Sequence, residues 1–430
     1  MNNTLKRWMD KSSELNERVT ASAVNAFDWL FHKESLVQSG KTPYTVIHTG
    51  DPMSVRYYAL TEKEIPLADN TVLAVQKKKH AVPLVLVPPL GVTTETFDLM
   101  PNRSLVRYMA ARGFQTYLID WGTPERRHAS LSMRDYADRM MTEALDAVRA
   151  HSGCEEVSLM GWCMGGLQVL IHAGLPDTQN IRAIVTVASP IDMRGGGLIA
   201  GVSRIINSPA KFIAHYTDFR LNKLNPESFH APGWVTALAF KLTDPIGSVT
   251  TYWDLLMNLW DREFVESHTT TSDYLNHMLS YPMGMVGDMF TKMSLHNQMA
   301  KGEFVLSRDR VAQFANIQVP MYVFAGAKDV LVAPSTAEHI LDVVGSSDKR
   351  FEVAPGGHMG VILGSSAQGA VWERAANWLA QRSQAPQSPA PTKPATKGSR
   401  PRARTKAAAA DAVTPATPRR RPTARKKAAV

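Results

Sequence analysis

The sequence predicts an α/β protein with a mostly parallel central sheet flanked by helices. Short runs rich in β-branched residues alternate with segments of helical periodicity, which is the pattern of successive strand–helix–strand units. The chain has 430 residues, of which 44% are hydrophobic, so it can bury one large core and carry insertions. A single large domain with an inserted segment is therefore expected.

The expected elements follow this alternation from about residue 83 onward. Ser132 with Asp135 three positions later marks the start of a helix, because a Ser at the cap and an acid in the first turn both favour a helix terminus. Apolar positions then recur through Val148 at helical spacing. The strands are expected at Pro83–Pro88, Gln115–Asp120, Glu156–Met160, Ile184–Ala188, Val319–Ala325 and Arg350–Val353. The helices are expected at Ser104–Ala111, Ser132–Val148, Met164–Gly174, Pro334–Val344 and Ala367–Ala380.

The sequence also predicts how the chain is divided into regions. Residues 1–41 form a helical extension, and residues 42–382 form the catalytic domain. Asp192–Val311 is rich in Met, Trp, Phe and Tyr and has helical periodicity. Inserted between two strands, it would cover the carboxyl ends of the sheet, where open α/β sheets bind ligands. We predict that it is a helical cap.

The positive charge of the chain is concentrated in its last residues. Ser383–Val430 holds 12 Lys or Arg and one acid, whereas the other 382 residues carry 36 basic and 38 acidic groups. The segment also holds 13 Ala and 8 Pro and no aromatic residue. Such a segment cannot bury enough surface to offset its ordering entropy, so 383–430 is predicted to be a disordered basic tail. DNA or another polyanion is its expected partner, with a merely solubilising tail as the alternative.

The sequence indicates an intracellular location. The amino terminus has no apolar stretch behind its positive charges, so a signal peptide is not expected. The longest apolar run, around Val82–Val92, is interrupted by proline and too short to span a bilayer. Two cysteines do not make a disulfide framework. We therefore expect a cytoplasmic protein with no transmembrane segment.

The motif Gly161-Trp-Cys-Met-Gly-Gly166 lies between a strand and a helix, and it indicates a nucleophile. A nucleophile elbow requires small residues two before and two after the reactive residue, because the chain turns sharply there. The turn exposes the Cys163 sulfur at the positive end of a helix, which favours the thiolate. Taken alone, G-x-C-x-G also fits a buried Cys in a glycine-rich turn.

The partners of Cys163 follow in the order that the α/β-hydrolase fold requires, nucleophile, acid and histidine. Asp329 follows the strand that ends in FAGAK, and His358 follows FEVAPGG. We therefore predict the α/β-hydrolase fold, with Cys163 as nucleophile, His358 as its base and Asp329 as the acid. The backbone N–H of Met164 is the first expected oxyanion-hole donor, and the second is expected near Leu90 or Gly91.

No cofactor or metal is expected, because the chain has no H-E-x-x-H and no paired C-x-x-C.

Several longer motifs resemble those of the polyhydroxyalkanoate synthases, especially the short classes. The likeness runs from about Thr42 to Gln381. Its motifs are TPYTVIH (Thr42–His48), DLMPNRSLV (Asp98–Val106), YLIDWGTPE (Tyr117–Glu125), GWCMGG, KGEF (Lys301–Phe304), MYVFAGAKDVLVAP (Met321–Pro334) and GGHMGVILGS (Gly356–Ser365). The family's nucleophile, acid and base fall on Cys163, Asp329 and His358.

The resemblance implies transfer of (R)-3-hydroxyacyl groups from coenzyme A to a growing polyester, through a thioester on Cys163. A 3-hydroxyacyl-CoA is then the substrate, and a polyester granule or the nucleoid is a further expected location. Because only residues 1–41 precede TPYTVIH, the short classes and their separate partner subunit are implied, with a homodimer as the alternative.

The sequence departs from the family in the loop PPLGVTTETFDL and at Val330, which follows Asp329. Two other functions therefore remain open. One is a thioesterase, esterase or polyester depolymerase of the same fold with a cysteine nucleophile. The other is a granule-associated or nucleic-acid-associated protein that acts mainly through its basic tail.

Overall fold

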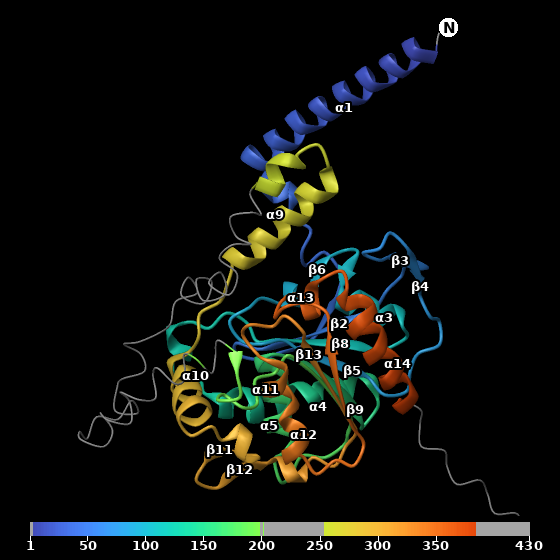
Figure 1. The fold of residues 1–430 in the computed structure, drawn as a ribbon. Helices are drawn as coiled ribbons and strands as arrows, with labels where there is room; N and C mark the ends of the chain where they lie inside the picture. The colour runs from blue at the N-terminus through green and yellow to red at the C-terminus, as the bar shows by residue number, and fades with distance from the viewer. Residues whose placement is uncertain (1–2, 198–200, 202–252, 384–430) are drawn as a thin grey trace, which may run out of the picture. The chain divides into compact units, whose positions relative to one another are not determined.

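A computed structural model describes residues 3–197, 201 and 253–383 of the chain (Figure 1). The predicted tail from residue 384 onward and residues 198–200 and 202–252 of the predicted cap lie outside the described residues. The prediction of disorder for the tail therefore stays a prediction.

An eight-stranded sheet forms the centre of the fold, in the order β1-β2-β8-β5-β9-β10-β13-β14. From β8 to β14 each strand runs parallel to its neighbour, whereas β2 is antiparallel to both β1 and β8. This arrangement, with helices on both faces, confirms the predicted α/β-hydrolase fold class. The strands are β1 Thr45–Thr49, β2 Ser54–Tyr58, β5 Leu84–Val87, β8 Thr116–Asp120, β9 Val157–Trp162, β10 Ile181–Val187, β13 Met321–Gly326 and β14 Lys349–Ala354.

Two hydrophobic cores lie on opposite faces of this sheet. Alternate residues of β5 point to opposite faces, so Val85 and Val87 join one core and Leu84 and Leu86 join the other. Helices α4 (Met141–Ser152), α5 (Met164–Ala173), α11 (Pro334–Glu338) and α12 (Ile340–Val343) cover the first face. Helices α3 (Leu105–Ala111), α13 (Gly360–Leu363) and α14 (Glu373–Arg382) cover the second. Burial on both faces explains why these strands read as continuous apolar runs.

The predicted elements are all present, but three predicted helices are divided. The helix predicted at Ser132–Val148 begins as a π-helix over Asp135–Met140 before α4. His339 separates α11 from α12. The last helix begins as a π-helix over Gln368–Trp372 and continues as α14. Apolar spacing did not reveal the π-turns, because each is a short insertion of i→i+5 hydrogen bonds within a longer α-helical segment.

Among the described residues, the strands that the sequence did not predict are β1 and β2, which lie together at one side of the central sheet, and three small two-stranded pairs. Edge strand β1 is exposed or only half buried along its length, so it lacks the continuous apolar signal of the central strands. The small two-stranded pairs are β3 Glu64–Pro66 with β4 Val72–Ala74, β6 Asp98–Met100 with β7 Arg103–Ser104, and β11 Glu303–Ser307 with β12 Arg310–Gln313. In the described part of the chain, 3₁₀ turns lie at Thr94–Phe97, Arg126–His128, Met299–Lys301 and Phe314–Asn316.

The predicted cap interval is helical over most of its described part. It contains α9 (Arg262–Asn276), α10 (Met283–Asp288) and a π-helix at Met289–Leu295. Its end differs from the prediction, because β11 and β12 form a hairpin there. Phe304 of this hairpin is fully buried in the core beside α5, so the hairpin belongs to the packed body of the domain.

The predicted amino-terminal extension contains α1 (Asn3–Phe31) and α2 (Lys33–Leu36). Helix α1 contacts the residues around the start of α9. The Asn25 amide donates to the Leu259 carbonyl at 2.8 Å, and Arg262 pairs with Asp28 at 2.5 Å. These polar contacts link the extension to the predicted cap rather than to the sheet.

Along the described helices, no stretch is both long enough and apolar enough to cross a bilayer.

Ser383, predicted as the first residue of the tail, is instead part of the packed domain. It is 3% exposed. Its hydroxyl accepts a hydrogen bond from the Val82 N–H at 2.9 Å and lies 3.2 Å from the Val82 carbonyl. The boundary of the folded unit therefore falls after Ser383.

We predict that Ser383→Ala lowers the free energy of unfolding by about 1–3 kcal/mol, because it leaves the buried Val82 N–H without a partner. Urea denaturation of the full chain measures this change. Ser365→Ala, at an exposed turn residue, is the control and should change stability little. Equal effects of the two substitutions would contradict the role assigned to Ser383.

Candidate active site

Cys163 lies at the turn between β9 and α5, as the elbow motif predicts. Its backbone has φ 52° and ψ −119°, a region that costs free energy for any residue with a Cβ. A Cβ on Gly161 would come within 2.6 Å of the backbone of Gly165, and one on Gly165 would overlap the carbonyl oxygen of Val87. The two glycines are thus required for the tight turn. The turn leaves Cys163 half-buried.

Asp329 lies in the loop after β13, and both of its oxygens are engaged. Oδ1 accepts hydrogen bonds from the N–H groups of Leu331 and Val332 at 2.9 and 2.8 Å. Oδ2 lies 2.8 Å from Nδ1 of His358. The Asp329 side chain is fully buried. The loop therefore fixes the carboxylate so that one oxygen faces the histidine.

His358 lies between β14 and α13 and connects the carboxylate to the cysteine. Its Nδ1 lies 2.8 Å from Oδ2 of Asp329, and Cys163 is near enough to influence its pKa. The ring stacks at a tilt on Trp162 with ring centroids 5.4 Å apart. The structure thus brings together three residues that are far apart in the chain. Cys163 and Asp329 are 166 positions apart, and Asp329 and His358 are 29 positions apart. This arrangement is compatible with the predicted roles of nucleophile, base and acid, which remain a prediction.

The surroundings of His358 favour its protonated form. Burial by itself lowers the pKa of His358. Negative charge at Cys163 and the hydrogen bond to Asp329 act in the opposite direction and raise the pKa to about 10. His358 can therefore hold a proton next to Cys163.

The predicted oxyanion-hole residues lie beside the elbow. Met164 is the first residue of α5, so its N–H is one of those without a partner inside the helix. Leu90 and Gly91 follow β5, which pairs with β9 so that Val87 lies opposite Gly161. Gly91 has φ +81°, a conformation that favours glycine. The site thus has backbone segments that follow two neighbouring strands, Met164 after β9 and Leu90–Gly91 after β5.

Two tyrosines near Cys163 were not identified from the sequence. Tyr274 of α9 hydrogen-bonds Thr96, and the Tyr281 hydroxyl donates to the Leu90 carbonyl at 2.6 Å. Burial, and then the nearby negative charge of Cys163, raise the pKa of Tyr281 above its ordinary value. Both lie in the interval predicted as a cap, where aromatic residues are common, so no sequence signal distinguished them.

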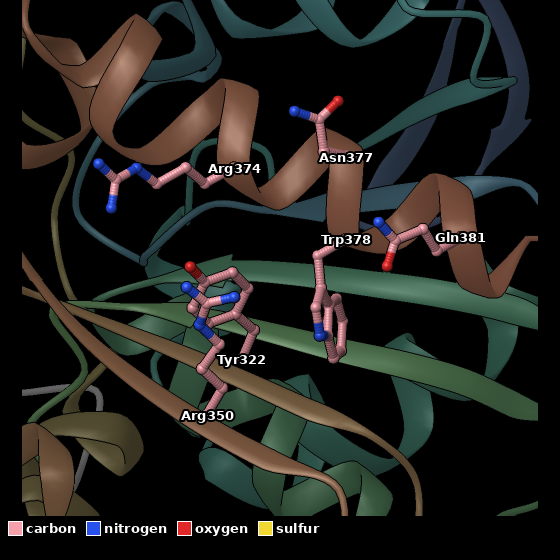
Figure 2. A pocket seen from close by; sticks show the side chains of 6 residues that line it. All are labelled: Tyr322, Arg350, Arg374, Asn377, Trp378 and Gln381. Atoms are coloured by element: carbon pink, nitrogen blue, oxygen red, sulfur yellow. The ribbon is translucent and has the colours of Figure 1, made fainter.

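A separate cavity of about 250 Å³ lies beside α14, away from this site. Figure 2 shows its lining residues, among them Arg350 and Arg374. Tyr322 and Arg350 are each the second residue of their strands, so the cavity lies at the amino ends of β13 and β14, whereas Asp329 and His358 follow the carboxyl ends. Both arginines already pair with Glu352. The cavity therefore has no direct part in the chemistry of Cys163.

Within the described ranges, no three His, Cys, Asp or Glu side chains are grouped so that they could hold a metal ion.

Comparison with known proteins gives one family and several named relatives. A family model described as serine aminopeptidase, S33, matches residues 102–359, a span that includes Cys163, Asp329 and His358. The poly(3-hydroxyalkanoate) polymerase subunit PhaC of Haloferax mediterranei is 26% identical over 383 residues, covering 88% of this chain and 71% of that protein. The protein of the same name from Haloarcula marismortui is 26% identical over 378 residues, covering 87% of this chain and 75% of that protein. A solved hydrolase from Pseudomonas aeruginosa is 17% identical, covers 80% of this chain and 98% of its own, and superposes with a TM-score of 0.44.

We predict that Cys163→Ala lowers the pKa of His358, because it removes the largest influence that raises this pKa and leaves burial to lower it. An NMR pH titration of the histidine rings measures the shift. His172, whose pKa burial lowers to about 4, lies outside these contacts and serves as the internal control. An unchanged His358 titration would mean that Cys163 does not interact with the ring.

Proposed function

The chain belongs to the α/β-hydrolase family described as serine aminopeptidase, S33, and within this family we propose that it is a cysteine-dependent acyltransferase. It moves (R)-3-hydroxyacyl groups from coenzyme A to a growing polyester. The observation that carries the proposal is a cysteine, rather than a serine, at an elbow beside a buried His358–Asp329 pair. The relatives named as poly(3-hydroxyalkanoate) polymerase subunits support the same reaction.

The first half of the reaction forms an acyl-enzyme. The Cys163 thiolate attacks the thioester carbonyl of the acyl-CoA, a new C–S bond forms, and the C–S bond to coenzyme A breaks. His358 supplies the proton that the leaving CoA thiolate takes. A thiol nucleophile suits this step because exchange between two thioesters is nearly balanced, so the acyl-cysteine stays reactive.

The second half extends the polymer. The hydroxyl of a 3-hydroxyacyl unit attacks the acyl-cysteine carbonyl, and His358 takes the hydroxyl proton as general base. The new ester bond forms while the Cys163 sulfur leaves. Asp329 accepts from Nδ1–H of His358, which keeps Nε2 facing the reacting groups. In both halves the N–H of Met164 and an N–H near Leu90 or Gly91 stabilise the carbonyl oxygen as it becomes negative.

Transfer competes with hydrolysis, so the site must exclude water. Tyr274 and Tyr281 come from the predicted cap and lie near Cys163, and the fully buried Trp162 of β9 stacks on the His358 ring. The family description is that of a hydrolase, which favours a thioesterase or depolymerase as the second candidate. Free 3-hydroxy acid as the only product would establish this second candidate instead.

The protein also acts together with other macromolecules in this proposal. Its relatives are named as polymerase subunits, which supports a partner polypeptide. The product is a polyester, so the protein works in the cytoplasm at a granule surface. The basic residues after Ser383 supply affinity for DNA or another polyanion, because the folded part carries almost no net charge.

We predict that Cys163→Ala reduces CoA release from 3-hydroxybutyryl-CoA by about 10⁴-fold or more, as expected for loss of a nucleophile, without loss of stability. Cys163→Ser retains only weak turnover. CoA release and polymer formation are followed together, and Cys154→Ala, at the other free cysteine, is the matched control. Full activity of Cys163→Ala would exclude Cys163 as nucleophile.

We predict that truncation after Pro386, which keeps Ser383 in place, leaves CoA release unchanged and removes DNA binding at low salt. Binding through Lys and Arg is mostly counterion release, so the affinity of the full chain should fall steeply with salt and depend little on DNA sequence. A gel-shift assay measures this. A full-length variant with the 12 basic tail residues changed to Gln separates charge from length. Persistent DNA binding by both variants would locate the basic surface on the folded unit.

A further inference from the structure

Three carbonyl groups of the loop after β5 accept hydrogen bonds from residues outside the loop. The Trp121 indole N–H donates to the Pro88 carbonyl at 2.8 Å. The Tyr281 hydroxyl donates to the Leu90 carbonyl at 2.6 Å, and the Leu279 N–H donates to the Gly91 carbonyl at 2.9 Å. The loop therefore takes its conformation from three other parts of the fold.

These hydrogen bonds also determine the direction of the N–H groups in the loop. In a planar trans peptide, the carbonyl of one residue and the N–H of the next point in opposite directions. Holding the Leu90 carbonyl toward Tyr281 therefore fixes the N–H of Gly91, and holding the Gly91 carbonyl toward Leu279 fixes the N–H of Val92. The Gly91 N–H is one of the groups at the position predicted for the second oxyanion donor.

The ring of Tyr281, like its hydroxyl, restricts the conformation of the loop. A Cβ on Gly91 would overlap the Tyr281 ring, so the ring lies directly against the glycine, which has φ +81°. Tyr281 is thus in contact with the backbone whose conformation decides where the N–H points.

The same loop is packed against the nucleophile. β5 pairs with β9 up to the pair Val87–Gly161, and Gly165 of α5 lies so close to the Val87 carbonyl that a Cβ would overlap it. The charge of Cys163 contributes to the raised pKa of Tyr281, after burial. Tyr281 and the loop therefore lie close to the turn that carries Cys163.

We propose that Tyr281 is a positioning residue, which holds the Gly91 N–H in the direction needed to stabilise the oxyanion on the carbonyl carbon attacked by Cys163. Trp121 fixes the start of the same loop at Pro88. The inference rests on the proposed function, and it assigns part of the oxyanion hole to a residue from the predicted cap. It also gives the tryptophan of the Asp120-Trp121-Gly122 segment a defined structural task.

Tyr281→Phe tests this, since it keeps the ring against Gly91 and removes only the hydroxyl. We expect kcat for CoA release from 3-hydroxybutyryl-CoA to fall about tenfold with KM unchanged. This is less than the 10²–10³-fold loss typical when an oxyanion donor itself is removed. Trp121→Phe, which frees the Pro88 carbonyl, should change kcat in the same direction. Tyr136→Phe is the matched control, because the Tyr136 hydroxyl is buried in the same core and has no hydrogen-bond partner in the described part of the chain.

A second measurement separates oxyanion stabilisation from a general effect on structure. A trifluoromethyl ketone analogue of the acyl-CoA forms a tetrahedral adduct with a thiolate, whereas a thioether analogue does not. Tyr281→Phe should weaken binding of the ketone about tenfold and leave binding of the thioether unchanged. Alkylation of Cys163 by iodoacetamide, which needs no oxyanion hole, should keep its rate.

Three outcomes would overturn the inference: unchanged kcat in Tyr281→Phe, an equal loss in Tyr136→Phe, or an equal loss in the alkylation rate. Failure of the proposed function is distinguishable, because it would appear in the unsubstituted protein as absence of CoA release. Acylation of Cys163 by p-nitrophenyl acetate then tests Tyr281 by itself, since that reaction also passes through an oxyanion. A tenfold slower acylation of Tyr281→Phe would support the positioning role without any synthase activity.

Discussion

The parallel pairing of β5, β9, β10, β13 and β14 is the constraint on which the site depends. In a parallel sheet all carboxyl ends lie at one edge, so the loops that follow the strands meet there. Residues separated by long stretches of chain, such as Cys163 after β9 and His358 after β14, thereby come into contact. The register is held by burial on both faces, because slipping a strand by one residue would exchange its side chains between the two cores.

The strained turn at Cys163 is stable only because its surroundings leave no alternative. A positive φ at a residue with a Cβ costs free energy, and this is offset by the fully buried β9 on one side and the buried α5 on the other. Gly161 and Gly165 allow strand and helix to approach closely. The same packing that offsets this cost also holds the sulfur at the start of a helix, where negative charge is favoured.

The charge arrangement of the site depends on burial in the same way. His358 and Asp329 are each 6% exposed, so their interaction is little screened by solvent and each charge needs a partner. Asp329 receives two backbone hydrogen bonds in addition to the histidine, which keeps its carboxylate in one orientation. Tyr274 and Tyr281 connect the predicted cap to the loop after β5 through their hydroxyl groups. Cap and sheet thus meet at the reacting groups.

Local patterns in the sequence determined the order of strands and helices, the elbow and the three polar residues at strand ends. Continuous apolar runs reveal buried strands, and glycine at two fixed offsets reveals the turn, since both are local requirements of the backbone. Edge strands such as β1, the π-turn before α4 and the burial of Ser383 depend on neighbours distant in the sequence, and only the tertiary structure decided them. The same holds for Tyr281. Its hydroxyl matters because it reaches the Leu90 carbonyl across 191 positions of the chain, and no local spacing records which of many cap aromatics makes that contact.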